Sequence, residues 1–181
     1  MKIIFFCILS LPLLALSRRA LFSLKNPGLY RLAVWECILW LAIQNYRYLI
    51  VEEFDLQQLI SSALMIASLV FVLSAVFVMR KKGRVSKQGR DHTLFGFEKT
   101  TVLIESGIFK HVRHPMYSSL LFLAWGLLLR NIEVALLIVA LIATCSGVLA
   151  AWMEEKENIA YFGESYRHYT LKTKRFIPCV I

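Results

Sequence analysis

Charged residues are scarce in this chain of 181 residues, and their scarcity excludes an ordinary soluble globule. Only 18% of the residues are charged, whereas 58% are hydrophobic, and the mean hydropathy is +0.61. Soluble domains are typically about half apolar and about a quarter charged. The composition therefore predicts an integral membrane protein, of a length that suits one domain.

Motifs of nucleotide-binding and metal-binding proteins are also missing. No G-x-G-x-x-G occurs, so a soluble Rossmann domain is not expected. The cysteines and histidines lack the close spacing of metal ligands (Cys7, Cys37, Cys145 and Cys179; His92, His111, His114 and His168). We therefore expect no metal site, and we expect the cysteines to be small buried hydrophobes.

Five apolar runs follow one another, and each is long enough, or nearly so, for a membrane helix. They cover residues 1–16, 32–50, 59–79, 117–129 and 134–152. The first run also fits a signal peptide, but the sequence after it is a poor start for a secreted chain, so we favour a helix. The predicted fold is an all-α integral membrane protein with about five transmembrane helices in one domain, 1–181. Residues 1–79 supply three spans, and residues 80–181 supply a cytoplasmic loop, a helical hairpin and a tail.

Three positions refine this pattern. Glu36 interrupts the second run, and a charge at that depth usually faces a bundle interior. We expect it to pair with a neighbouring helix, and a substrate contact is the alternative. Asn26-Pro27-Gly28 predicts a turn in a linker at 17–30, and Gly163 predicts a break in a polar helix that follows the last span.

The basic residues predict the orientation. With the N-terminus outside, eighteen Lys and Arg fall on the cytoplasmic side, in 17–31, 80–113 and the tail after Trp152, and three fall outside. Such a bias places the N-terminus outside and the basic loop and the C-terminal tail in the cytoplasm. The net charge of +9 reflects this bias and attraction to anionic lipid, so we expect the lipid bilayer, and no nucleic acid, as a partner.

The stretch 107–117, G-I-F-K-H-V-R-H-P-M-Y, holds polar side chains at the start of the fourth run. Pro115 suits the first helical position because its missing N–H would have no partner there. A helix N-terminus favours anions and polar head groups. The runs on either side of residues 130–133 predict a helical hairpin, and its return arm ends at a second polar cluster, 154–157.

Arms of similar length bring Glu154 and Glu155 beside Arg113, His114 and Tyr117. Carboxylates at a helix C-terminus oppose the helix dipole, so their presence asks for a cation. Successive helical residues point about 100° apart, so we expect only one of the two glutamates to face the resulting pocket.

Four segments together resemble a known family: R-H-P-M-Y (113–117), E-E (154–155), Y-F-G-E-S-Y-R-H-Y (161–169) and T-K-R-F-I-P (173–178). They look like the integral-membrane isoprenylcysteine carboxyl methyltransferase and phospholipid methyltransferase family, over roughly 94–178. The resemblance implies an enzyme that uses S-adenosyl-L-methionine and methylates a lipophilic acceptor at the cytoplasmic face. A phospholipid N-methyltransferase, a non-catalytic scaffold and a sterol-reductase-like NADPH enzyme are the alternatives.

The resemblance also implies roles for particular residues. Cofactor contacts fall on Leu94, Thr101, Val102, Leu103, Ile104, Phe109, His114, Pro115, Met116, Tyr117 and Glu154. Catalytic roles fall on Arg113, Glu154 and Glu155. Charge agrees with this, because a carboxylate suits the cofactor's sulfonium and ammonium groups and an arginine suits its carboxylate. For an amine acceptor, Glu155, His111 or Tyr117 are candidate bases.

The acceptor site departs from the family pattern. Relatives that act on isoprenylcysteine carry an arginine one helical turn before the first glutamate, where this chain has Ala150. An arginine-to-alanine change removes a bidentate clamp for a carboxylate. Lys172 or Arg175 in the tail are candidates to replace it, and the carboxylate acceptor is in doubt.

Overall fold

Six α-helices and two short 3₁₀ helices make up the part of the chain that the structure describes, and no β-strand occurs there. The computed structural model describes residues 1–18, 21, 26–49, 55–82 and 102–178. Two predicted cofactor contacts, Leu94 and Thr101, lie outside these ranges, as do His92, Cys179 and most of the basic segment. The all-α prediction is confirmed for the described residues.

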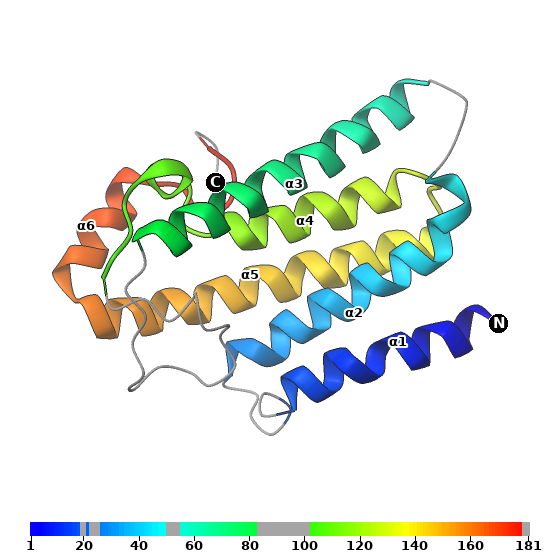
Figure 1. Ribbon diagram of the computed structural model, residues 1–181, viewed down its shortest axis with the longest axis horizontal. Coiled ribbons are helices and arrows are strands. Elements are labelled where there is room, and N and C mark those ends of the chain that lie inside the picture. Colours follow the sequence, from blue (N-terminus) through cyan, green and yellow to red (C-terminus); the bar gives the residue numbers. More distant parts are fainter. Residues whose placement is uncertain (19–20, 22–25, 50–54, 83–101, 179–181) are drawn as a thin grey trace.

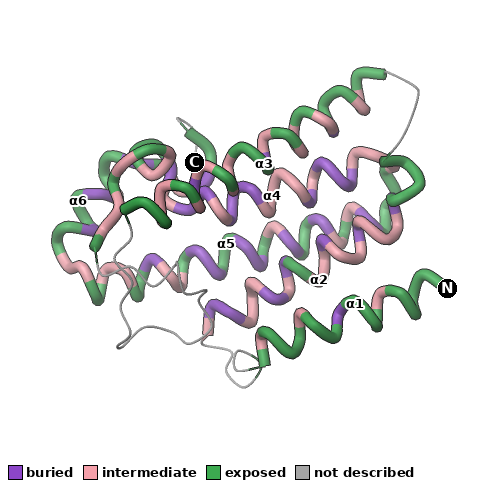
Figure 2. The backbone as a smooth tube through the Cα atoms, viewed as in Figure 1, coloured by how far each residue is buried: buried purple, intermediate pink, exposed green. Residues whose placement is uncertain are grey.

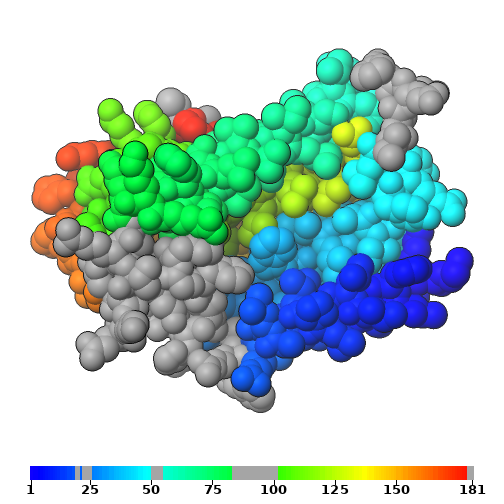
Figure 3. Space-filling view, viewed as in Figure 1, coloured from blue at the N-terminus to red at the C-terminus, as the bar shows by residue number. Residues whose placement is uncertain are grey.

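The helices lie side by side along one direction, with the last helix at one end of the bundle (Figure 1). Their bounds are α1 Lys2–Ser17, α2 Pro27–Asn45, η1 Tyr46–Tyr48, α3 Leu56–Lys82, η2 Gly107–Lys110, α4 Pro115–Leu128, α5 Val134–Phe162 and α6 Glu164–Lys172. α4 contacts α3, α2 and α5, α2 also packs along α5, and α1 packs against α2. α1 is therefore the outer layer on one side, as the space-filling view also shows (Figure 3).

The second helix starts and ends earlier than its apolar run predicts. Asn26 caps it, with Oδ1 accepting a hydrogen bond of 2.7 Å from the Gly28 N–H, and Pro27 takes the first helical position. The helix then ends at Asn45, and a 3₁₀ turn follows. The predicted linker at 17–30 and span at 32–50 were therefore wrong at their ends, because Asn-Pro-Gly is a helix start here and not a free turn.

Two helices within the described ranges, α3 and α5, are long and apolar enough to cross a membrane, whereas α1 and α4 are apolar but shorter. Figure 2 shows buried residues concentrated on α2, α4 and α5, whereas α1 is mostly exposed and α3 is mostly exposed or intermediate. Exposed side chains of α3 include Leu59, Ile66, Leu73 and Phe77. An apolar surface of this extent suits lipid and not water.

The same lipid-facing surface corrects the prediction for the cysteines. Cys7 and Cys145 are exposed on the outside of the bundle, and Cys37 is half-buried. In a membrane protein an apolar residue needs no burial in the core, because lipid is as apolar as the interior.

Small residues let the helices approach closely around the core. A Cβ on Gly126 of α4 would lie 2.8 Å from Met65 Cγ of α3, and Ser61 Oγ donates a hydrogen bond of 2.7 Å to the Gly126 carbonyl. Between α2, α4 and α5 the core is apolar, with Val34, Leu41 and Leu128 almost fully buried. This packing fixes the relative positions of the helix ends that carry the polar clusters.

Glu36 finds a partner on a neighbouring helix, as predicted. Ser10 Oγ of α1 donates a hydrogen bond of 2.6 Å to Glu36 Oε2 of α2. Ser10 is the buried residue of α1, so this bond helps to hold α1 against α2.

Candidate functional site

The register of the α4–α5 hairpin brings the two predicted polar clusters together. Trp125 Nε1 of α4 donates a hydrogen bond of 3.1 Å to Thr144 Oγ1 of α5. Further along, Gly147 of α5 packs beside Leu121, and Tyr117 packs against Ala150. The arms therefore stay paired back to the start of α4, and the glutamates of α5 reach that start as the sequence predicts.

The tail pairs with the residues that precede α4. Val112 and Lys174 form an isolated parallel β-bridge. The Arg113 N–H donates to the Lys174 carbonyl at 2.8 Å, and the His114 N–H donates to the Arg175 carbonyl at 3.1 Å. This pairing brings Arg175 to the same site as Arg113, although 62 residues separate them in the numbering.

Glu155 of α5 is buried and binds both of these arginines. Arg113 Nε donates a hydrogen bond of 2.8 Å to Oε1, and Arg175 donates through Nη2 to Oε2 at 2.6 Å and through Nε to Oε1 at 3.1 Å. Glu155 lies in the polar part of α5, past the apolar run that ends at Trp152. Burial opposes its ionisation, but the nearby His114 imidazole and the hydrogen bonds from Arg175 and Arg113 outweigh burial, so the pKa of the Glu155 carboxyl lies well below its usual range.

Arg113 also stabilises the end of α6. Its Nη1 donates to the Thr170 carbonyl at 3.1 Å and to the Thr173 carbonyl. These carbonyls belong to the last turn of α6 and the residue after it, where helical partners are lacking. The guanidinium thus joins α5, α6 and the segment before α4.

Glu154 contacts a different set of residues. Tyr117 Oη donates a hydrogen bond of 2.5 Å to Glu154 Oε1, and Arg31 Nη1 of α2 lies 4.0 Å from the same oxygen. The imidazole of His114 lies between the two glutamates, with Nδ1 3.8 Å from Glu154 Oε2 and Nε2 3.5 Å from Glu155 Oε1. Both glutamates therefore contact the 113–117 motif. The prediction was that only one of the two faces a pocket, and this stays a prediction: Glu155 is buried, whereas the side chain of Glu154 is 18% exposed.

His114 carries an incompletely satisfied polar group. Its side chain is buried, and Nε2 makes no hydrogen bond of normal geometry within the described part of the chain. A buried ring nitrogen without a close partner is costly, so it marks a place where a further polar group would be favourable. The side chain of Glu154 beside it is 18% exposed.

A tyrosine of α6 binds the turn before the motif. Tyr169 Oη donates a hydrogen bond of 2.6 Å to the Phe109 carbonyl in η2. Burial raises the pKa of Tyr166 to about 12, and it also raises the pKa of Tyr169 above its ordinary value. Both hydroxyls therefore stay protonated at neutral pH. Through the hydrogen bond that its carbonyl accepts from Tyr169, Phe109 contributes a backbone contact between η2 and α6. Gly107, at φ +62°, lets η2 approach Val78 of α3.

Some of the remaining predicted site residues lie beside the 113–117 motif and the two glutamates, and others do not. Pro115 is buried and Met116 half-buried in the first turn of α4, and Val102, Leu103 and Ile104 precede η2 in irregular structure. Ala150 is fully buried against Tyr117 and Phe176, so it contributes packing. Lys172 is exposed at the end of α6, and within the described residues it makes no ion pair or hydrogen bond with the cluster. Arg175, the other tail candidate, is engaged by Glu155.

Arg31 is the member of the site that the sequence did not predict. The site cluster is defined here as Arg31, Arg113, His114, Tyr117, Glu154, Glu155 and Arg175. The sequence prediction placed Arg31 at the end of a linker. Only the recognition of Asn26 as a helix cap would have placed Arg31 about one turn inside α2. Within the described ranges no three His, Cys, Asp or Glu side chains gather as metal ligands would.

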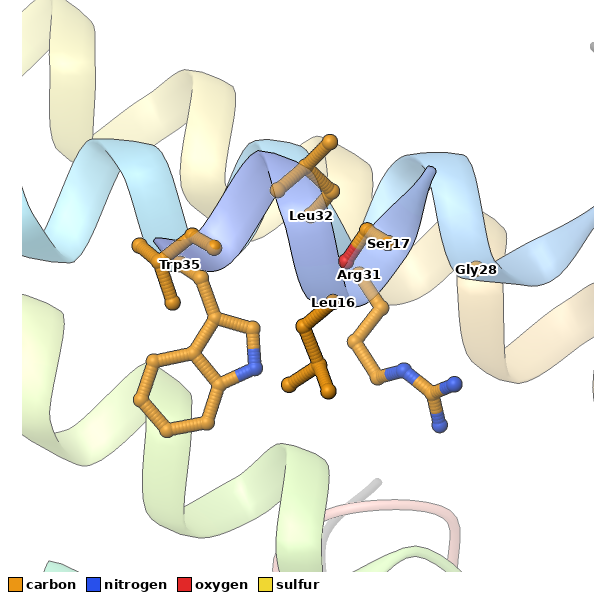
Figure 4. Close-up of a pocket in the computed structure, with 7 residues that line it drawn as sticks. Leu16, Ser17, Gly28, Arg31, Leu32 and Trp35 are labelled. Atoms are coloured by element: carbon orange, nitrogen blue, oxygen red, sulfur yellow. The ribbon is translucent and has the colours of Figure 1, made fainter. Parts of the chain in front are cut away.

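Arg31 also lines a cavity between α1 and α2. The cavity measures about 200 Å³ and is formed by Leu13, Leu16, Ser17, Gly28, Arg31, Leu32 and Trp35. Figure 4 shows Arg31 and Trp35 extending from the same side of α2, with Leu16 of α1 between them. The cavity is thus apolar at the Trp35 end and cationic at the end next to Glu154.

Comparison with known proteins identifies the family. The model of the phospholipid methyltransferase family matches residues 56–165, more than half of the chain, from α3 into α6. Methanethiol S-methyltransferase of Pseudomonas deceptionensis is 34% identical over 71 residues, which are 39% of this chain and 26% of that protein. The chain thus matches about a quarter of that relative's length. No solved structure matches the present chain significantly. The matched family region contains the hairpin and both glutamates, so the chain belongs to the phospholipid methyltransferase family, a family of membrane methyltransferases.

Proposed function

We propose that this protein is an S-adenosyl-L-methionine-dependent methyltransferase that acts on a lipophilic acceptor delivered by the bilayer. The observation that carries the proposal is the hydrogen bond from Tyr117 to Glu154, formed where the first turn of α4 meets α5. It supports the proposal because it joins two polar residues of the family-matched region. Neither of these side chains is needed to satisfy the backbone groups at a helix end.

The residues present fit the proposed cofactor. Glu154 offers a partly exposed carboxylate to a sulfonium or ammonium group, and His114 Nε2 is a buried atom in want of a partner. Glu154, His114 and Tyr117 would hold the cofactor, with Pro115, Met116, Phe109 and residues 102–104 around it. Leu94 and Thr101 remain predicted contacts. When bound, the cofactor supplies a methyl group on a positively charged sulfur, which an electron-rich atom displaces without a metal.

The two glutamates divide the work. Glu155 is held on both oxygens by guanidinium groups, so we assign it and Arg113 to positioning rather than to proton transfer. The Glu154 carboxylate is partly exposed and accepts a hydrogen bond from the Tyr117 hydroxyl. It is therefore the better candidate to receive a proton from the methyl acceptor. The buried ring of His114 and the tail make the remaining contribution to catalysis, because they align the reacting groups and exclude water.

The orientation in the membrane follows from the charge distribution. We propose five spans with the N-terminus outside, so that the site cluster lies at the cytoplasmic face. Support comes from the eighteen Lys and Arg on that side against three on the other. α1 and α4 are short for a hydrocarbon core of about 30 Å, and their polar flanks would lie in the head-group region.

The acceptor is narrowed by what surrounds Ala150. That position is fully buried by packing, which disfavours an isoprenylcysteine-type carboxylate clamp at α5. A phospholipid amine is one remaining class, in keeping with the family. A thiol is the second candidate, because the curated relative is a methanethiol S-methyltransferase.

Calorimetric titration with S-adenosylhomocysteine, on protein folded in nanodiscs, tests the proposal. We expect binding to the wild type and about tenfold weaker binding to Glu154→Gln, since one charge-assisted contact is worth on the order of 1.4 kcal/mol. Glu164→Gln is the matched control, because Glu164 forms a surface pair with Arg167 outside the cluster.

Absence of binding by folded wild-type protein would contradict the proposal. Binding of NADPH instead would favour a reductase, and binding of neither would favour a scaffold. Transfer of a labelled methyl group to an alkanethiol, a lysolipid amine or a prenylcysteine then identifies the acceptor class.

A further inference from the structure

The cavity between α1 and α2 has the shape and polarity of a site for one end of a lipid-like molecule. Its lining is mostly apolar, and the charged group among the described lining residues is Arg31. Leu16 and Trp35 on its rim are 65% and 36% exposed, so the cavity opens on the side of the bundle where lipid would lie.

The polar end of the cavity adjoins the site cluster. The Arg31 side chain is 13% exposed, and its Nη1 lies 4.0 Å from Glu154 Oε1. A molecule that contacts Arg31 from the cavity is therefore separated by only the Arg31 side chain from Glu154, the carboxylate that we propose acts in methyl transfer. The cavity and the cluster share Arg31 as a common wall.

The other arginines of the cluster are engaged elsewhere. Arg113 binds Glu155 and the end of α6, and Arg175 binds both oxygens of Glu155. Lys172 is exposed at the end of α6. Arg31 pairs with Glu154 and also lines this cavity.

The cavity has room for a segment of one alkyl chain. Its volume is about 200 Å³. Arginine binds carboxylates and phosphates in a planar, two-pronged geometry, so the complementary head group is an anion.

We propose that this cavity receives the methyl acceptor from the bilayer, and that Arg31 is the specificity-determining residue that binds an anionic group on a single-chain amphiphile. The inference rests on the proposed function, since it assigns the acceptor of that same reaction. Arg31 thereby takes the role of the clamp that is missing at Ala150, but from α2 instead of α5.

Quenching of Trp35 fluorescence tests the site without knowledge of the natural acceptor. The probes are a bromoalkyl carboxylate, a bromoalkyl phosphate and a bromoalkyl alcohol of equal chain length, added to protein in nanodiscs of uncharged lipid. Trp35→Phe provides the background from the other three tryptophans. We expect half-maximal quenching by at least one anionic probe at a concentration at least fivefold lower than for the alcohol.

Two variants separate the ends of the cavity. Arg31→Gln should abolish the preference for the anion, whereas Leu16→Asn should weaken the anionic and neutral probes alike. Arg18→Gln is the matched control, because Arg18 is an exposed cation near the same end of α1 that does not line the cavity. Arg31→Lys should retain part of the preference.

The proposal is overturned if the alcohol quenches the wild type as well as both anions do, or if the preference survives in Arg31→Gln. If Arg31→Gln fails to fold, the comparison of probes on the wild type still decides. Titration of the same samples with S-adenosylhomocysteine keeps the two claims apart. Binding of that compound without an anion preference sinks this inference alone, and no binding sinks the proposed function.

Discussion

The two ends of the helix bundle use polar residues in different ways. At the end that holds the α4–α5 turn, Asn45, Gln57 and Gln58 donate side-chain amides to the carbonyls of Leu127, Leu129 and Arg130. Gln57 and Gln58 thereby provide partners for carbonyls directly after α4, where a terminating helix leaves carbonyls unsatisfied. At the other end, the contacts of Glu154 and Glu155 within the described residues are with side chains of Arg, Tyr and His.

This difference separates polar residues that close the end of a helix from polar residues that gather around one another. Neutral amides suffice to close the ends of helices, at a net gain of about 1 kcal/mol per hydrogen bond. The site cluster instead gathers three guanidiniums, two carboxylates, an imidazole and a phenol close together, with the desolvation that this implies. Such a cluster is weak evidence for stability and stronger evidence for a function.

Glu155→Gln should give the largest effect. It leaves Arg113 and Arg175 without a buried counter-charge, and breaking such a pair costs about 3–5 kcal/mol. Unfolding in mixed micelles should show this loss of stability, and binding of S-adenosylhomocysteine should fall with it. A variant as stable as the wild type would mean that the pair does not hold the tail to α5.

The same carboxylate predicts a dependence of stability on acid. The pKa of Glu155 is lowered in the folded protein relative to about 4.3 in the unfolded chain. Its contribution is therefore complete above that unfolded value and is lost as the pH falls toward the folded pKa. The difference in unfolding free energy between the wild type and Glu155→Gln should be constant from pH 6 to 8 and shrink below about pH 4. A difference that instead grows on acidification contradicts the lowered pKa.

Asn45→Leu tests the opposite end. Asn45 is fully buried and donates a hydrogen bond of 2.7 Å to the Leu127 carbonyl, so its loss should cost about 1–3 kcal/mol. Affinity for S-adenosylhomocysteine, measured on the folded fraction, should stay within twofold of the wild type. An equal fall in affinity would remove the distinction between the two ends.

Tyr117→Phe should give the smallest effect. It removes the hydroxyl that donates to Glu154 but keeps the ring that packs on Ala150. We expect affinity for S-adenosylhomocysteine to fall about threefold, which is under 1 kcal/mol, with unfolding almost unchanged. A shift in the pH profile of methyl transfer would further show that the hydroxyl tunes Glu154, whereas a loss of stability alone would assign it to structure.

The hairpin could be predicted because it depends on local features. Two apolar runs, a short polar turn and Pro115 at a helix start define both arms, and they bring the glutamates to Arg113 and Tyr117. One argument for that meeting was wrong in detail. α5 continues to Phe162, so the glutamates lie well before its C-terminus, where the dipole has little effect.

The parts that were missed depend on contacts distant in sequence. Nothing in the residues around Arg175 indicates that its backbone pairs with the His114 region, because an isolated bridge has no periodic pattern. Arg31 was missed because Asn26-Pro27-Gly28 suits both a turn and a capped helix, and only packing against α5 distinguishes them. The exposure of Cys7 and Cys145 reflects lipid as the surrounding solvent, which composition indicates but does not map to residues.

α5 is one uninterrupted helix from the hairpin turn to Phe162, and it carries both the apolar run and the two glutamates. Its 29 residues extend about 43 Å, at about 1.5 Å each, which exceeds the thickness of a hydrocarbon core. The extra length is the polar part that follows Trp152, beyond the apolar run. Because no break separates the two parts, any tilt of the apolar run moves the two glutamates with it.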